Sequence, residues 1–116
     1  MIAFAEAKTI ATMLAAVGEP TRMLVLHRLT EGPHHVGQLA ELVGVPMVNM
    51  SHHLGVLRQA GLIDDVKQGR RVIYSLRADV FTPAADGVAV GELRLGSYRM
   101  TLARVAPAAR RTRKAA

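Results

Sequence analysis

The chain has 116 residues, of which 50% are hydrophobic and 3% aromatic, and it contains no cysteine. This length predicts one domain with a modest aliphatic core, and the absence of cysteine excludes disulfides, thiolate metal ligands and a cysteine nucleophile. Residues 1–17 lack the basic start of a signal peptide, and no stretch reaches the roughly 18 apolar residues that a membrane span requires. We therefore expect a cytoplasmic protein without membrane contacts.

Charge is distributed unevenly along the chain. Residues 1–66 carry a net charge of −2, and residues 67–116 carry a net charge of +8. A basic half indicates a polyanionic partner, nucleic acid before membrane. Residues 104–116 contain five basic residues and no acid, so we expect a disordered tail, for which simple solvation is the alternative to nucleic-acid binding.

Four helices are predicted over residues 2–17, from about residue 20 to the Gly32-Pro33 break, and over residues 36–43 and 47–60, because apolar residues recur there at helical spacing. The breaks between them contain Gly18, Gly32-Pro33 and Gly44-Val45-Pro46. The inward-facing residues are expected to be Ile10, Met13, Leu14, Val17, Met23, Leu24, Leu26, Leu29, Leu39, Ala40, Val43, Met50, Leu54 and Leu57. The first helix has a second apolar face around Ala3, Ala7, Ala11 and Leu14, which predicts a homodimer.

After Gly61 the spacing of apolar residues changes from helical to alternating. A strand is expected to begin at Leu62-Ile63 and to return over residues 72–76, after a turn at residues 67–70. Helices followed by a hairpin with a basic tip predict a mainly α fold with a small β part (α+β), a winged helix-turn-helix DNA-binding domain over residues 1–77.

Residues 78–103 are expected to be an extension that contacts the dimer partner and contains a second hairpin. A two-residue turn at Gly96-Ser97 would pair Leu95 with Tyr98, Leu93 with Met100 and Gly91 with Leu102. This register places the large apolar side chains on one face, and Gly at the first turn position favours a type II′ turn.

The fourth helix carries the side chains expected to read DNA. Its outward, N-terminal residues are small or neutral and can form hydrogen bonds or apolar contacts with base edges in the major groove. They are Met47, Val48, Asn49, Ser51 and His52. For each of them, a contact to phosphate or water is the alternative. His53 lies nearer the buried side, so packing or a phosphate contact is expected rather than a base contact.

Basic residues are expected to contact the DNA backbone. Lys67, Arg70 and Arg71 surround the tip of the first hairpin, where they would meet phosphates or a narrow minor groove. A merely soluble turn is the alternative for these three. Arg58, near the end of the fourth helix, would contact phosphate or favour the helix dipole without a role in DNA binding.

Four motifs together resemble the ArsR-type bacterial repressors: GEPTR at 18–22, VGQLA at 36–40, SHHLGVLRQAGL at 51–62 and GRRVIYSL at 69–76. The resemblance covers roughly residues 9–77, with the motifs in the family's order and spacing. It implies a winged helix-turn-helix, a symmetric dimer, binding to a DNA operator, and release by a metal ion or another inducer in many members.

The chain departs from that family in three places. Metal-sensing members carry a Cys-x-Cys pair on the third helix, where this chain has His35 and Gly37. Many members end in a long dimerisation helix, which Gly87, Gly91, Gly96 and Pro107 disfavour here. The fourth helix begins Pro46-Met47-Val48, where the family usually has polar residues, and this leaves the operator sequence open.

These observations predict a homodimeric, sequence-specific repressor of a DNA operator, with no catalytic residues, no cofactor, no protein-held metal and an unknown inducer. No catalytic arrangement is visible, and no His has a second His four residues away on one helix. A metal site completed by His34 or His35 across a dimer is the alternative for the histidines. The alternatives for function are an architectural or RNA-binding module without a sensor, and a protein-interaction module that keeps the fold.

Overall fold

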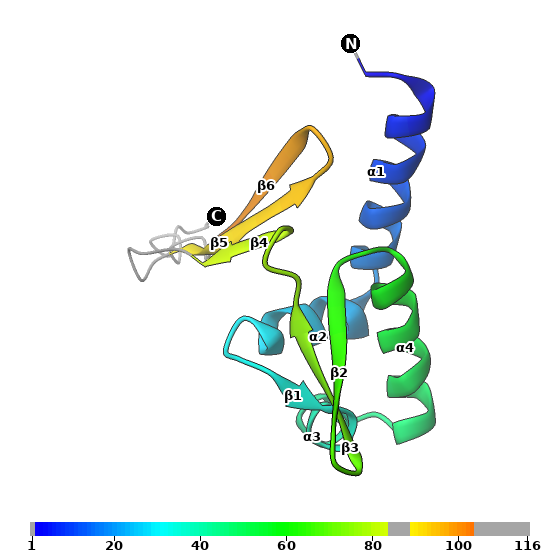
Figure 1. Cartoon of the computed structure of the whole chain (residues 1–116), viewed down its shortest axis with the longest axis vertical. Helices are drawn as coiled ribbons and strands as arrows, with labels where there is room; N and C mark the ends of the chain where they lie inside the picture. The colour runs from blue at the N-terminus through cyan, green and yellow to red at the C-terminus, as the bar shows by residue number, and fades with distance from the viewer. Residues whose placement is uncertain (1, 84–88, 104–116) are drawn as a thin grey trace, which may run out of the picture.

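The computed structural model describes residues 2–83 and 89–103 and contains four helices and two small antiparallel sheets (Figure 1). The helices are α1 (Phe4–Val17), α2 (Pro20–Leu29), α3 (Val36–Val43) and α4 (Met47–Gln59). One sheet contains β1 (His34–His35), β2 (Ile63–Gln68) and β3 (Arg71–Leu76), and the other contains β4 (Phe81–Pro83), β5 (Ala89–Leu95) and β6 (Tyr98–Ala103). The predicted α+β, winged helix-turn-helix architecture is confirmed.

Local signals determine where the helices begin. Pro20 occupies the first turn of α2, where its missing N–H costs nothing, and the Glu19 side chain accepts a hydrogen bond from the Arg22 N–H at 2.9 Å. His35 caps α3: its Nδ1 accepts from Gln38 N at 3.3 Å, while the Gln38 side chain accepts from His35 N at 3.0 Å. The first helix begins at Phe4, two residues later than expected.

Aliphatic side chains from all four helices and both sheets form one core. The prediction of its members was wrong at three positions, since Leu14, Met23 and Leu24 are 44%, 44% and 53% exposed. Ala16 and Val25 are buried instead. These residues belong to α1 and α2. Each of these two helices has apolar residues on more than one side, so helical spacing alone does not identify the side that packs.

The wing consists of β2, β3 and the turn between them. Gln68 pairs with Arg71 and Lys67 pairs with Val72, so the turn is the two residues Gly69-Arg70. It is shorter than the expected turn over residues 67–70. The two-residue strand β1 pairs with β3 through His34 opposite Tyr74 and His35 opposite Ile73. This third strand was not predicted, because two residues show no periodicity.

The second hairpin has the predicted register. Leu95 pairs with Tyr98, Leu93 with Met100 and Gly91 with Leu102. Gly96 has φ +64° and Ser97 has no positive φ, which is the φ pattern of the expected type II′ turn. The unpredicted strand β4 pairs with β5 and lies so close that a Cβ at Gly91 would fall 2.6 Å from the Thr82 carbonyl oxygen.

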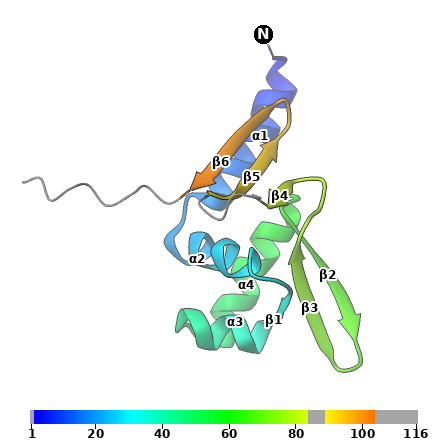
Figure 2. The same ribbon diagram turned by 90° about the vertical axis from the view of Figure 1, so that its left-hand side faces the viewer.

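This hairpin packs on the first helix of its own chain. Leu93 and Leu95 are buried, and the tip is held by a 2.9 Å hydrogen bond from Ser97 N to Glu6 Oε2. The tip and the start of α1 lie at one end of the molecule, while α3, the start of α4 and the wing tip lie at the other (Figure 2). The expected disordered tail, residues 104–116, lies outside the described residues.

In the part of the chain that the structure describes, no helix is long and apolar enough to cross a membrane.

Candidate nucleic-acid interface

The outward side of α4 near its N-terminus forms the reading face, which we define as Met47, Val48, Asn49, Ser51 and His52. All five side chains are exposed, and Val48 is 77% exposed. The inward side of the same helix carries Met50, Leu54 and Leu57, each fully buried. Because the core already holds α4 through these three residues, the reading face is free to contact another molecule.

The first turn of α4 presents backbone donors as well as side chains. Its N-cap residue is Pro46, and no side chain caps the helix. The initial N–H groups of a helix lack partners within the helix and carry the positive end of its dipole, so they favour an anionic acceptor. No aspartate or glutamate lies in this first turn. The start of α4 is therefore suited to an external anion such as phosphate.

His53 points away from the reading face. Its side chain is 16% exposed, with Nδ1 3.1 Å from Arg22 Nη1 and 3.9 Å from Glu19 Oε1. Arginine can only donate, so His53 Nδ1 is the acceptor and the ring proton is on Nε2. The hydrogen bond that Glu19 accepts from Arg22 N lowers the pKa of its carboxyl, and the positive charge of Arg22 adds to this. This position favours the packing role of His53 over a base contact.

The wing tip carries basic side chains that the rest of the described chain does not neutralise. Lys67, Arg70 and Arg71 are exposed, and none of them makes an ion pair within residues 2–83 or 89–103. The tip lies at the same end of the molecule as the start of α4 (Figure 1). Arg58 is exposed in the last turn of α4, at the C-terminal end of this helix.

Arg77, at the base of the wing, is neutralised in contrast. Its Nε and Nη2 donate to the two carboxylate oxygens of Asp79 at 3.0 and 2.9 Å, and Asp64 Oδ1 lies 3.9 Å from Nη1. The hydrogen bonds from Arg77 lower the pKa of Asp79, and those to Asp79 raise the pKa of Arg77. The net positive charge of the wing is therefore concentrated at its tip.

The neighbouring histidines of β1 are both engaged in local hydrogen bonds. His34 Nδ1 lies 2.7 Å from the Gly32 carbonyl oxygen, and His35 Nδ1 caps α3. Among the described residues, no group of three or more His, Asp or Glu side chains is arranged to hold a metal ion.

Two residues that position His53 were not predicted as part of the interface. Glu19 and Arg22 hold His53 from the start of α2, and Arg22 Nε also donates to the Ala16 carbonyl oxygen at 2.6 Å. Arg22 and His53 are 31 residues apart in the sequence, so no local pattern predicts their contact. The GEPTR motif at 18–22 was the only signal that pointed to this segment.

Known proteins resemble this chain over its helical part and wing. A helix-turn-helix domain family matches residues 17–66. The HTH-type transcriptional regulator NmtR of Mycobacterium tuberculosis is 40% identical over 70 residues, which are 60% of this chain and 58% of NmtR. The transcriptional repressor SdpR of Bacillus subtilis is 37% identical over 65 residues, 56% of this chain and 72% of SdpR.

A solved structure agrees with these relatives. The crystal structure of an ArsR family transcriptional regulator superposes with a TM-score of 0.57 at 30% identity, covering 61% of this chain and 78% of that one. The matched segment thus spans a little over half of NmtR and nearly three quarters of SdpR. The names of these relatives support a regulator rather than an enzyme.

Proposed function

Because this chain belongs to the ArsR family of winged helix-turn-helix transcriptional regulators, we propose that it is a homodimeric repressor that binds a pseudo-palindromic DNA operator. The two copies of α4 would enter successive major grooves, and the two wings would contact the flanking backbone. The observation that carries this proposal is the division of α4 into a buried side and an exposed reading face at the end where the wing tip lies.

Each part of the interface has its own expected contact. Asn49 can bridge N6 and N7 of adenine, Ser51 and His52 can donate to or accept from base edges, and Val48 can touch a thymine methyl group. Lys67, Arg70, Arg71 and Arg58 would contact phosphates. His53 would hold α4 in place through Arg22 rather than touch a base.

The test is selection of bound DNA from a random pool, followed by measurement of affinities for the selected site and its single-base variants. The wild-type protein should enrich one site with two-fold symmetry. The Asn49→Ala variant should lose about 1–3 kcal/mol of discrimination at one base pair per half-site and keep its preferences elsewhere. No enriched site would contradict the proposal, and enrichment of RNA over duplex DNA would favour the architectural or RNA-binding alternative.

Dimerisation would use the outward side of α1. Phe4 is 83% exposed and Leu14 is 44% exposed. The same side of the helix carries Ala3, Ala7 and Ala11, and Lys8 is the charged residue beside them. The apolar face of the second hairpin contributes less than expected, because Leu93 and Leu95 are already buried in their own chain. A stable interface needs about 1,600 Å² in total, so residues that adjoin α1 would have to be buried with it.

Sedimentation at micromolar concentration tests this interface. The wild-type protein should be a dimer, and Leu14→Glu should be a monomer because a buried unpaired charge is costly. Thr9→Glu is the matched control: Thr9 is exposed on another side of α1, so this variant should remain a dimer. A wild-type monomer would contradict the proposal.

A thiolate sensor is excluded by the absence of cysteine from the sequence. Arsenite, Cd²⁺ and Pb²⁺ need soft ligands, so operator affinity should not respond to them. A loss of affinity of about tenfold on adding arsenite or Cd²⁺, reversed by a chelator, would contradict this expectation.

One observation favours the alternative of a protein-interaction module. Met47 and Val48 are exposed apolar side chains in the first turn of α4, where a protein surface could cover them. If the random pool yields no site, the Val48→Asp variant should abolish binding to the protein partner of such a module.

A further inference from the structure

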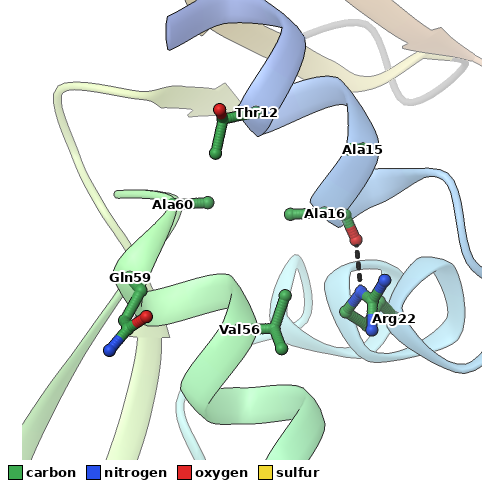
Figure 3. A pocket seen from close by; sticks show the side chains of 7 residues that line it. All are labelled: Thr12, Ala15, Ala16, Arg22, Val56, Gln59 and Ala60. Atoms are coloured by element: carbon green, nitrogen blue, oxygen red, sulfur yellow. Dashed lines mark hydrogen bonds between the residues drawn. The ribbon is translucent and has the colours of Figure 1, made fainter.

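A pocket of about 350 Å³ opens between α1 and α4, next to the first turn of α2 (Figure 3). Its lining residues are Thr12, Ala15, Ala16, Arg22, Val56, Gln59 and Ala60. Small apolar side chains form most of its wall, and Ala16 and Ala60 face each other across it in Figure 3. This volume lies at the lower end of the range found for small-molecule sites, and the pocket is open to solvent on one side.

Arg22 is the charged residue of this pocket. It is half-buried, and its Nε and Nη1 make the contacts to Ala16 and His53 described above. Its Nη2 makes no hydrogen bond, and no carboxylate lies within 4.0 Å of the guanidinium, among residues 2–83 and 89–103. No acidic residue lines the pocket. Glu19 is the carboxylate that the charge of Arg22 already stabilises from beyond 4.0 Å. A partly desolvated guanidinium with a free Nη2 favours a further anion in direct contact, and its planar fork suits a carboxylate.

We infer that this α1–α4 pocket binds a small organic monocarboxylate. The carboxylate would pair with Arg22, and a short aliphatic or aromatic body would pack against Ala15, Ala16, Val56 and Ala60. The volume suits a body of roughly four to eight carbon atoms. A metal ion does not fit this lining, which offers a guanidinium and no carboxylate, imidazole or thiolate.

The pocket is connected to the reading face through Arg22. The guanidinium donates to His53 on α4 at 3.1 Å, and the rings of His52 and His53 have their centroids 5.6 Å apart. A bound carboxylate would compete with His53 for the guanidinium and so loosen the hold of α2 on α4. This regulatory part deepens the proposed function and rests on it. In this scheme the effector of the regulator is an organic anion and not a metal ion bound by thiolates.

Binding is tested on the protein without DNA, so that the result does not depend on the proposed function. The probes are butyrate, hexanoate, octanoate, benzoate and phenylacetate at millimolar concentration, followed by ligand-observed NMR and calorimetry. At least one should bind, and the corresponding neutral amide should bind about tenfold more weakly, because it lacks the charge that pairs with Arg22. If none of the five binds, or if the amide binds equally well, the inference is wrong.

Ala60→Leu fills the pocket and should reduce binding of the best carboxylate about tenfold. Ala5→Leu is the matched control, since Ala5 is exposed on α1 and does not line the pocket. This control should bind as the wild type does, and equal binding by Ala60→Leu would contradict the site. Arg22→Lys keeps the charge and loses the fork, so its binding should also weaken.

The regulatory part is tested separately with the selected operator. The best carboxylate should lower the operator affinity of the wild type about tenfold and leave that of Ala60→Leu unchanged. Carboxylate binding without any change in operator affinity would overturn the regulatory part and leave the site standing. Failure of the protein to bind any DNA, with carboxylate binding intact, would instead contradict the proposed function.

Discussion

The two ends of this molecule use their side chains in different ways. At the end that carries the reading face and the wing tip, Val48, Arg70 and Arg71 are exposed. The two arginines make no ion pair within residues 2–83 or 89–103. At the other end, Leu93 and Leu95 are buried and Ser97 binds Glu6. The exposed residues of the first end can therefore change without affecting the fold, whereas these residues of the second end hold the hairpin to α1.

The largest effect on stability is expected on the buried side of α4. Leu57→Ala should lower the free energy of unfolding by about 2–5 kcal/mol, because Leu57 is fully buried and its loss leaves a cavity. Val48→Ala, on the exposed side of the same helix, should change it by less than about 0.5 kcal/mol. Urea denaturation measures both. Comparable losses would mean that the reading face is part of the fold.

The hairpin end should be sensitive to a single methyl group. Gly91→Ala should cost about 1–3 kcal/mol, because the new Cβ would collide with Thr82 and the Phe81 ring. Gly55→Ala on α4 has open space around its Cβ and should stabilise the protein by about 0.4–1 kcal/mol. Thermal unfolding compares the two. A neutral Gly91→Ala would show that β4 does not hold the second sheet.

The wing tip should affect DNA binding and leave stability unchanged. The double variant Arg70→Ala, Arg71→Ala should bind all DNA sequences more weakly, with a salt dependence about two units shallower. Arg77→Ala should keep the wild-type salt dependence, since Asp79 already neutralises Arg77. Affinities measured over a range of salt concentrations give both slopes. An unchanged slope in the double variant would make the wing a simple surface turn.

The smallest effect concerns pH. The pKa of Glu19 is lowered in the folded protein, so its ionised form stabilises the fold at neutral pH. That contribution is lost as the pH falls below about 4.3 and through the lowered value. Glu19→Gln should therefore be slightly less stable than the wild type at pH 7, and the difference should close in acid. A difference that stays constant down to pH 3 would point to a cause other than ionisation.

The helices could be predicted closely because their signals are local. Pro20, Gly44 and the regular apolar spacing locate α3, α4 and the start of α2 to within one residue, whereas α2 ends at Leu29, before the expected break at Gly32-Pro33. The hairpin register was equally accessible, since Gly96 fixes the turn and alternation fixes the pairs. The side of α1 that packs could not be predicted, because alanine and leucine residues lie on several sides of this helix. Spacing alone did not show that Ala16 is buried and Leu14 exposed.

Contacts between distant segments were the main part of the site that the sequence could not reveal. The Arg22–His53 contact joins α2 to α4, and the α1–α4 pocket exists only after three helices have packed. Strands β1 and β4 are two and three residues long, and they form because a partner strand offers free backbone groups. By contrast, the exposed position of Asn49 and of the wing tip follows from spacing and turn chemistry alone.

The cap of α3 constrains the mutational routes by which this chain could acquire the Cys-x-Cys pair of metal-sensing relatives. A Cβ at position 37 would lie 3.2 Å from Cε1 and 3.3 Å from Nδ1 of His35, the ring that caps the helix. Cysteine at position 37 would therefore crowd this ring if it arose first. Cysteine at position 35 would remove the ring and sacrifice only the cap, a cost of about 1 kcal/mol. The two substitutions are thus epistatic, because position 37 is crowded only while position 35 carries the histidine ring.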